Sequence, residues 1–157
     1  MTRRRARSQP RRRTKAGANA GAGTDSNPWS DVVVAVIRDG ERVLVTRRDD
    51  DAHLGGFDEF PGGHRTPDES LEAACVREAR EEVGLPIRVV RLLSVAWHED
   101  AARRLALTFF ECTCEGATTL ADEVVARRGA RWVTTSELAG LRFPPANRDV
   151  VQRLIAP

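Results

Sequence analysis

The chain of 157 residues contains only three cysteines and no long apolar run, and each shortage excludes a class of protein. The cysteines, Cys75, Cys112 and Cys114, are an odd number without the spacing of a zinc site. Because Cys112 and Cys114 would lie on the same side of a strand, a bridge between them would be strained. We therefore expect three reduced thiols that pack as small hydrophobic groups, in a protein of the cytoplasm.

No apolar stretch approaches the roughly 20 residues that a membrane-spanning helix needs, so no contact with a membrane is expected. No apolar segment follows the arginines near the N-terminus, which argues against a secretory signal peptide. No internal repeat is present.

Residues 1–27 lack any large apolar residue after Met1, so they cannot contribute to a core and are predicted to be disordered. They carry seven arginines and Lys15 against Asp25, a net charge of +7, while the rest of the chain has 17 basic and 22 acidic residues. A basic tail of this kind can bind nucleic acid. The tail has no aromatic residues for base stacking, which favours a solubilising tail or an upstream start codon wrongly chosen.

The predicted domain, residues 28–157, opens with two β-branched segments, 31–38 and 42–48. Asp39-Gly40 between them is a typical hairpin sequence. The all-apolar run Val32–Ile37 indicates a strand that is buried on both faces.

Later segments have the patterns of further strands and short helices. The predicted strands are Phe57–Phe60, Ile87–Trp97, Leu105–Cys114 and Arg131–Val133. A small helix is expected around Glu137–Leu141, starting at Thr135 or Ser136, and a terminal helix at 146–155 would bury Val150, Val151, Leu154 and Ile155. This order predicts an α/β fold in which a mixed sheet lies between helices.

The stretch from Gly63 to Leu85, GHRTPDESLEAACVREAREEVGL, organises the chain. A Gly62-Gly63 turn precedes a helix predicted at Pro67–Val83. In this prediction Thr66 caps the helix and Glu69 closes a capping box.

Two carboxylates, Glu78 and Glu82, lie four residues apart on this helix and are separated by only about 40° around its axis. Glu81 lies beside them. Such crowding is costly unless a cation offsets the repulsion, and oxygen ligands suit Mg²⁺ or Mn²⁺ better than zinc. The alternative is a solvated charged face in which Arg77 pairs with Glu81.

The spacing of the whole stretch favours the metal site. Its pattern is Gly63, five residues, Glu69, seven residues, Arg77-Glu78-Ala79, one residue, Glu81-Glu82, one residue, Gly84-Leu85. Chance agreement at the seven fixed residues of this pattern, at about one in fifteen each, is on the order of one in 10⁸ per start position. The stretch resembles a complete Nudix box.

This resemblance to the Nudix family implies an α/β/α sandwich that hydrolyses a nucleoside diphosphate linked to another group, with Mg²⁺ or Mn²⁺. Within the family the chain is most similar to the MutT branch, over about Asp31 to Ile155. Beyond the box, the likeness depends on Thr46-Arg47-Arg48, Asp51-Ala52-His53, Glu59-Phe60-Pro61-Gly62-Gly63 and Phe143-Pro144-Pro145-Ala146-Asn147.

The same resemblance implies roles for individual residues. For the nucleotide, Arg48 would contact it, Phe60 would line the base pocket, Asn147 would hydrogen-bond the base and Arg103 would close over it. For the metal and the chemistry, the ligands would be Gly62 through its carbonyl, Glu78, Glu82 and Glu123, with Asp122 as the alternative to Glu123. Arg77 would hold the carboxylates, and one glutamate among Glu78, Glu81 and Glu82 would act as general base.

Four of these residues also have structural interpretations. Asn147 could cap the last helix, since asparagine is a preferred cap. Phe60 could be an ordinary core residue. Arg103 could be a surface charge in a turn, and Arg48 could serve only the fold.

The resemblance implies a Mg²⁺-dependent pyrophosphohydrolase that converts 8-oxo-dGTP into 8-oxo-dGMP and pyrophosphate, which would keep oxidised guanine out of DNA during replication. One alternative is a Nudix hydrolase of CTP, dCTP or ADP-ribose. The other is a non-catalytic nucleotide- or RNA-binding module that uses the basic tail. A monomer is expected in each case.

Overall fold

The structure, a computed structural model, describes residues 29–51, 54–116, 125 and 129–156. The basic tail, Ala52, His53, Asp122 and Glu123 lie outside the described residues, and the predictions for them stay predictions.

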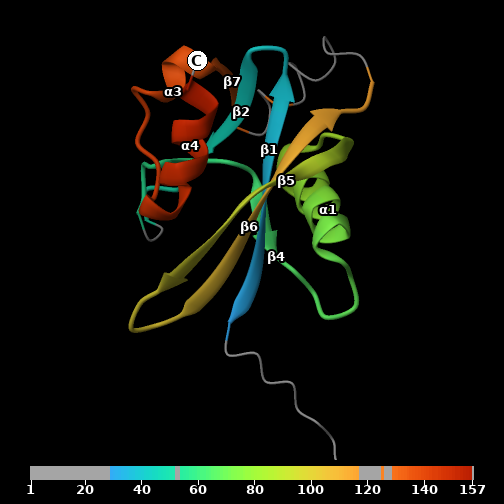
Figure 1. The fold of residues 1–157 in the computed structure, drawn as a ribbon, viewed down its shortest axis with the longest axis vertical. Coiled ribbons are helices and arrows are strands. Elements are labelled where there is room, and N and C mark those ends of the chain that lie inside the picture. Colours follow the sequence, from blue (N-terminus) through green and yellow to red (C-terminus); the bar gives the residue numbers. More distant parts are fainter. Residues whose placement is uncertain (1–28, 52–53, 117–124, 126–128, 157) are drawn as a thin grey trace, which may run out of the picture.

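A seven-stranded mixed sheet forms the centre of the molecule (Figure 1). Its strands are β1 (Ser30–Asp39), β2 (Arg42–Arg47), β3 (Asp58–Glu59), β4 (Gly62–His64), β5 (Ile87–Glu99), β6 (Arg104–Cys114) and β7 (Arg131–Thr134). Along the main path the order is β3-β2-β1-β6-β5, while β4 also pairs with β1 and β7 with β2. The β1–β6 pair is parallel and the others are antiparallel.

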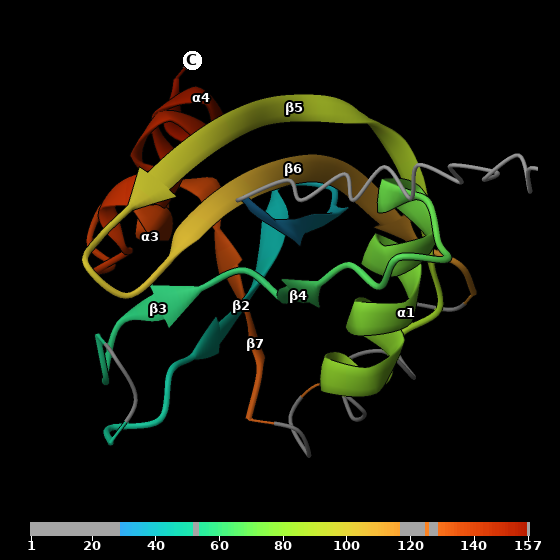
Figure 2. The same cartoon turned by 90° about the horizontal axis from the view of Figure 1, so that it is seen from below.

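Helices cover both faces of this sheet (Figures 1 and 2). One face packs on α1 (Leu71–Val83), and the other packs on α3 (Thr135–Leu138) and α4 (Arg148–Ile155), which follows the 3₁₀ turn η1 (Pro145–Asn147). The predicted α/β/α sandwich is confirmed. No helix in the described part of the chain is long and apolar enough to cross a membrane.

Strand β1 is buried on both faces, as the run Val32–Ile37 predicted. Val33, Ala35 and Ile37 belong to the core beneath α1, whereas Val34 and Val36 belong to the core beneath α3 and α4. The hairpin to β2 also forms as expected. Asp39 pairs with Arg42, and Gly40 adopts a φ of 60°, which glycine tolerates in a two-residue turn.

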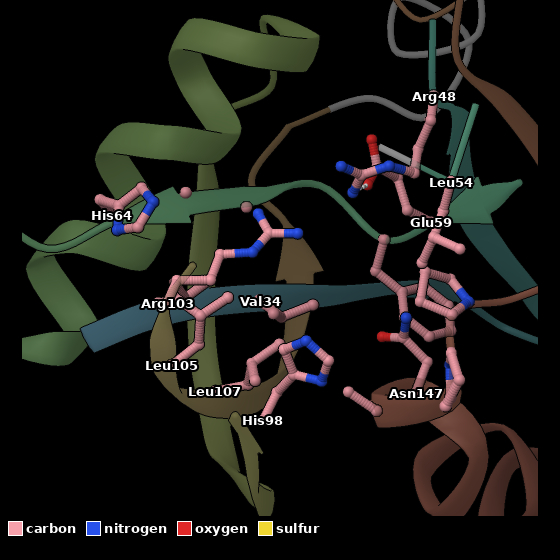
Figure 3. A pocket seen from close by; sticks show the side chains of 17 residues that line it. Val34, Arg48, Leu54, Glu59, His64, His98, Arg103, Leu105, Leu107 and Asn147 are labelled. Carbon is pink, nitrogen blue, oxygen red and sulfur yellow. Dashed lines mark hydrogen bonds and ion pairs between the residues drawn. The ribbon is translucent and has the colours of Figure 1, made fainter. Parts of the chain in front are cut away.

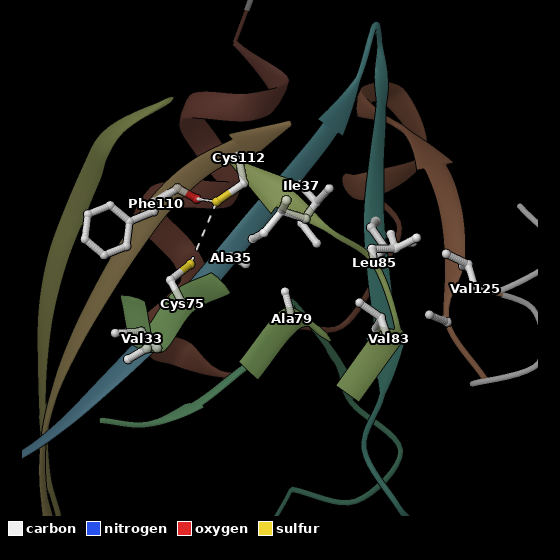
Figure 4. Close-up of a cluster of buried hydrophobic side chains, with 14 residues drawn as sticks. Val33, Ala35, Ile37, Cys75, Ala79, Val83, Leu85, Phe110, Cys112 and Val125 are labelled. Atoms are coloured by element: carbon white, nitrogen blue, oxygen red, sulfur yellow. Dashed lines mark hydrogen bonds between the residues drawn. The ribbon is translucent and has the colours of Figure 1, made fainter. Parts of the chain in front are cut away.

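The thiols of Cys75 on α1 and Cys112 on β6 meet in the first core, with their Sγ atoms 3.8 Å apart (Figure 4). Both are buried, and all three cysteines are free, as predicted. The contact with Cys75 and burial raise the pKa of the Cys112 thiol. A protonated buried thiol behaves as a small hydrophobic group.

The start of α1 corrects one prediction. The helix begins at Leu71, not at Pro67, and its N-cap is Ser70, whose hydroxyl accepts a hydrogen bond from the Ala73 N–H. Thr66 and Glu69 instead close a separate turn before the helix, in which the Glu69 carboxylate accepts from the Thr66 N–H at 2.8 Å. This turn leaves the second oxygen of Glu69 free to reach Arg77.

Other element boundaries also differ from the prediction. Gly62 and Gly63 form strand β4 against β1, not a turn. The small helix α3 begins at Thr135, as predicted, but it ends at Leu138 and not at Leu141, and the side chain of Thr134 forms a capping box with Glu137. On α4, Val150 is buried, but Ile155 at the end of the helix is 39% exposed.

Candidate active site

A cavity of about 320 Å³ opens on the α4 side of the sheet, beside the N-terminal half of β1 (Figure 3). Val34 and Leu107, from the parallel strands β1 and β6, contribute to its apolar lining. The lining continues with residues of the β2–β3 hairpin, of β4, of the β5–β6 hairpin and of η1. Segments far apart in the sequence therefore meet at one cavity.

At one end of this cavity the backbone of Gly62-Gly63 lies against two carboxylates of α1. Glu82 Oε2 accepts a hydrogen bond from the Gly62 N–H at 2.9 Å. Glu78 lies so close to Gly63 that a Cβ at residue 63 would collide with its carboxylate. The two glutamates, which their spacing placed on one face of the helix, thus reach the same dipeptide.

A third carboxylate, Glu59, adds to this charge. Burial raises the pKa of Glu82, and the negative charges of Glu59 and Glu78 raise it further. Burial also raises the pKa of Glu59, although Arg48 opposes this shift. Such mutual repulsion in a half-buried site favours a bound cation.

Arg77 organises the carboxylates from the outer side of α1. Its guanidinium donates to Glu69 at 2.7 Å, to Glu78 at 2.6 Å and to the carbonyl of His64 at 3.0 Å. The hydrogen bonds to Glu69 and Glu78 raise the pKa of Arg77 and keep it charged. Arg77 therefore ties α1 to β4 and to the turn before the helix, and its role of holding the carboxylates for a bound cation stays a prediction.

Glu81 occupies a different environment from Glu78 and Glu82. Its side chain is 64% exposed, and Arg77 lies 3.3 Å from it in the i,i+4 arrangement. It lines the outer groove between α1 and β5, not the main cavity. A direct role for Glu81 in the reaction stays a prediction.

The donor set fits a hard divalent cation. Glu78 and Glu82, with the carbonyl of Gly62, are the candidate ligands, and all three offer oxygen. Within the described residues, no group of three or more His, Cys, Asp and Glu side chains is arranged to hold a metal. In this structure the carboxylate of Glu78 is hydrogen-bonded to Arg77, and that of Glu82 is hydrogen-bonded to the Gly62 N–H. The fourth predicted ligand, Glu123, lies outside the described residues.

Arg48, directly after β2, forms an ion pair with Glu59 at 2.5 Å, and both line the cavity. About a quarter of each side chain is exposed. An arginine held by a carboxylate at the wall of a cavity is preorganised to contact an anionic ligand. The sequence assigns Glu59 no role of its own beyond its place in the Glu59–Gly63 motif. Its contact with Arg48 could not be predicted, because it depends on the pairing of β2 with β3.

Asn147 occupies the N-cap position of α4 but makes no capping hydrogen bond. Its backbone there is helical, so the side chain turns away from the helix and lines the cavity, with only 6% of the residue exposed. Since a buried side-chain amide normally has partners, this orientation weakens the capping interpretation and leaves the amide to a ligand.

Phe60 and Arg103 line the same cavity. Phe60 is 4% exposed and stacks on Phe143 with ring centroids 4.9 Å apart. It is therefore a core residue that also forms part of the cavity wall. Arg103 lies in the turn between β5 and β6, where it is paired with Asp100. His98 joins them in the cavity. Sequence reasoning gave His98 no role, because only the β5–β6 pairing shows that it faces the cavity beside Leu105.

Residues 28–154 match the model of the NUDIX domain, so the chain belongs to the Nudix family, and the predicted resemblance is confirmed. Nudix hydrolases generally use divalent metal ions such as Mg²⁺. The match includes the helix with its carboxylates and the Asn147 segment.

Two curated proteins of Escherichia coli (strain K12) are similar to the chain. One is an 8-oxo-dGTP diphosphatase, 33% identical over 127 residues, which are 78% of this chain and 94% of that protein. The other is a CTP pyrophosphohydrolase, 30% identical over 120 residues, which are 76% and 85% of the two chains. A solved structure from a study of MutT from Aliivibrio salmonicida and Vibrio cholerae aligns with a TM-score of 0.56 and 31% identity, over 80% of this chain and 96% of that one.

Proposed function

We propose that the chain is a Mg²⁺-dependent pyrophosphohydrolase that converts 8-oxo-dGTP into 8-oxo-dGMP and pyrophosphate. In this role it removes oxidised guanine nucleotides in the cytoplasm before DNA replication uses them. The observation that carries the proposal is the position of Asn147, which lines the same cavity as Gly62 and Gly63, the two residues that the carboxylates of α1 contact.

The lining of the cavity suits the two parts of a nucleotide. Phe60, Val34 and Leu107 offer apolar surface to a base, and Asn147 offers both a donor and an acceptor to its edge. Arg48 lines the same cavity and would contribute positive charge for the phosphates. A base bound near Asn147 directs its phosphates toward Gly62-Gly63.

The chemistry would occur beside Gly62-Gly63. Glu78 and Glu82, with the Gly62 carbonyl, would hold the cation, which would screen the phosphates from the acidic helix and lower the pKa of the attacking water. Water then attacks phosphorus, and the anhydride bond that releases pyrophosphate breaks. A glutamate that is not fully engaged by the cation accepts the proton of the water.

The substrate is tested by pyrophosphate release with Mg²⁺ from 8-oxo-dGTP, dGTP, dCTP, CTP and dATP, and by AMP formation from ADP-ribose. The proposal predicts the highest kcat/KM for 8-oxo-dGTP at low micromolar substrate. A higher kcat/KM for any other nucleotide would overturn the proposed substrate and leave the carboxylate site intact.

Hydrolysis of CTP is the second candidate, because a CTP pyrophosphohydrolase is similar over 76% of the chain. Asn147 favours the purine, because the resemblance to MutT-like enzymes assigns this asparagine to the edge of an oxidised purine. The panel above compares both substrates directly. A chain that lacks residues 1–27 separates either enzyme from a binding module, because an enzyme keeps its turnover without the basic tail.

A further inference from the structure

A single carboxylate organises the turn between β5 and β6. Asp100 Oδ1 accepts hydrogen bonds from the backbone N–H groups of Ala102 and Arg103, at 2.8 and 3.0 Å. Asp100 Oδ2 contacts two side chains, Nε2 of His98 at 3.2 Å and Nε of Arg103 at 3.4 Å. These hydrogen bonds, from the backbone of Ala102 and the ring of His98 above all, hold the pKa of Asp100 well below its usual range.

Both side chains that Asp100 contacts line the cavity, whereas Asp100 itself does not. His98 pairs with Leu105 across the hairpin, and this register turns its ring to the cavity side of the sheet. Strand β5 also packs against η1, which carries Asn147. In Figure 3, His98 and Arg103 project from the hairpin into the space that Asn147 borders.

The contact with Asp100 determines the tautomer of a neutral His98 ring. A carboxylate only accepts hydrogen bonds, so Nε2 carries the proton and Nδ1 keeps its lone pair. Within the described residues no hydrogen bond to Nδ1 of His98 is formed. Nδ1 is therefore the ring nitrogen that remains to accept a hydrogen bond from a ligand.

We propose that His98 is a specificity-determining residue whose Nδ1 accepts a hydrogen bond from an N–H of the bound base, and that Asp100 is the positioning residue that orients it. This inference rests on the proposed function, because it assumes that the cavity binds the base of a nucleotide. His98 and Asn147 then contact the base from two elements that pack against each other.

A purely structural role for Asp100 is the competing explanation, since aspartate commonly stabilises turns through backbone N–H groups. Such a role predicts loss of stability without a selective effect on substrate binding. Replacement of His98 distinguishes the two, because the turn itself needs no histidine.

The test compares KM and kcat at pH 8. His98→Phe keeps a ring without an acceptor, and we expect KM for the preferred nucleotide to rise about tenfold with kcat nearly unchanged. His98→Asn places its oxygen near the position of Nδ1 and recovers most of this loss. The matched control is Glu99→Gln on the same hairpin, whose carboxylate pairs with Arg104 outside the cavity and whose loss leaves KM unchanged.

Asp100→Asn tests the positioning role. The amide still accepts from the backbone, but its NH₂ group faces Nε2 and favours the opposite tautomer, so KM rises as in His98→Phe. In the His98→Phe background the same change adds less than about twofold, because residues that act through one contact are not additive. An equal effect of Asp100→Asn with and without His98 would show a structural role only.

A direct readout needs no turnover. The chain has only three histidines, so the ¹⁵N resonances of His98 can be assigned with the His98→Phe variant. We expect the Nε2–H tautomer in the free protein, its loss in Asp100→Asn, and a shift of the Nδ1 resonance on addition of 8-oxo-dGMP. An unchanged Nδ1 resonance on binding, or an unchanged KM for His98→Phe, overturns the inference. If the panel selects another nucleotide, the matching monophosphate replaces 8-oxo-dGMP, and the proposed substrate fails independently of His98.

Discussion

The carboxylate of Glu78 lies against the Cα of Gly63, in the space that a side chain at residue 63 would occupy. Gly63 therefore determines where Glu78 can lie. The backbone of Gly63 in turn is held by its antiparallel pairing with Val33 on β1, the central strand. The position of a candidate metal ligand is thus connected directly to the centre of the sheet.

Gly63→Ala should separate activity from stability. The new methyl group meets only the end of the flexible Glu78 side chain, which can move aside, so the free energy of unfolding changes little. The displaced carboxylate no longer reaches the candidate metal site, and kcat should fall by about 100-fold or more. Urea denaturation and pyrophosphate release measure the two effects, and a variant with normal kcat would contradict the placement of Glu78.

Gly62→Ala should have a different effect. A Cβ at residue 62 would collide with the backbone carbonyl of Val33, which cannot move without distorting β1. We expect a loss of about 1–3 kcal/mol in the free energy of unfolding. Gly140→Ala is the control, because its Cβ would lie 3.6 Å from the Glu137 carbonyl in ordinary contact. Equal stability of the Gly62 and Gly140 variants in urea would rule out the collision.

Glu78→Gln should abolish turnover without unfolding the protein. The amide is nearly isosteric and can still occupy the space beside Gly63, but it has no negative charge to bind a cation or to accept a proton. Loss of the Glu78 charge removes its repulsion of Glu82 but also its ion pair with Arg77, so we expect only a small change in the melting temperature. A drop in kcat of about 100-fold or more is expected. Turnover near that of the wild type would show that the assigned metal site is wrong.

The sequence predicted the elements of this site well because their signals are local. The spacing of Glu78 and Glu82 on one helix and the apolar run of β1 each depend on a few neighbouring residues. The start of α1 was predicted wrongly because Thr66 and Ser70 both have capping sequences, and only tertiary contacts decide between them. Thr66 and Glu69 form their own turn because Glu69 also binds Arg77.

Contacts between strands that are separated along the chain could not be predicted from the sequence. Arg48 and Glu59 meet because β2 pairs with β3, and His98 faces the cavity because two bulges set its register against β6. Neither relationship leaves a periodic pattern in the chain. The same limit applies to Asn147, because its sequence is equally compatible with capping α4 and with facing the cavity.

Glu69→Gln should lower stability in a pH-dependent way. Hydrogen bonds from Arg77 and from the Thr66 N–H lower the pKa of Glu69 to about 2, from an ordinary value of 4.5. A lowered pKa in the folded state means that the carboxylate stabilises the fold fully above about pH 4.5 and loses this contribution as the pH falls toward 2. The melting temperatures of the wild type and the variant should therefore differ most at pH 6–7, differ less below about pH 4.5 and converge only as the pH approaches 2. A difference that does not depend on pH would exclude the ionised contact with Arg77 as its cause.

Asn147→Ala should lower selectivity more than general activity. If the amide binds the edge of an oxidised purine, its loss should reduce the ratio of kcat/KM for 8-oxo-dGTP to that for dGTP by about tenfold or more. Because Asn147 makes no capping hydrogen bond, the variant should not show the loss of about 1 kcal/mol that is typical of a removed cap. Thr134→Ala provides the comparison, since Thr134 does cap α3 and its loss should cost stability without changing selectivity. An equal loss of activity on both nucleotides, together with a lower melting temperature, would assign Asn147 to the helix and remove it from the site.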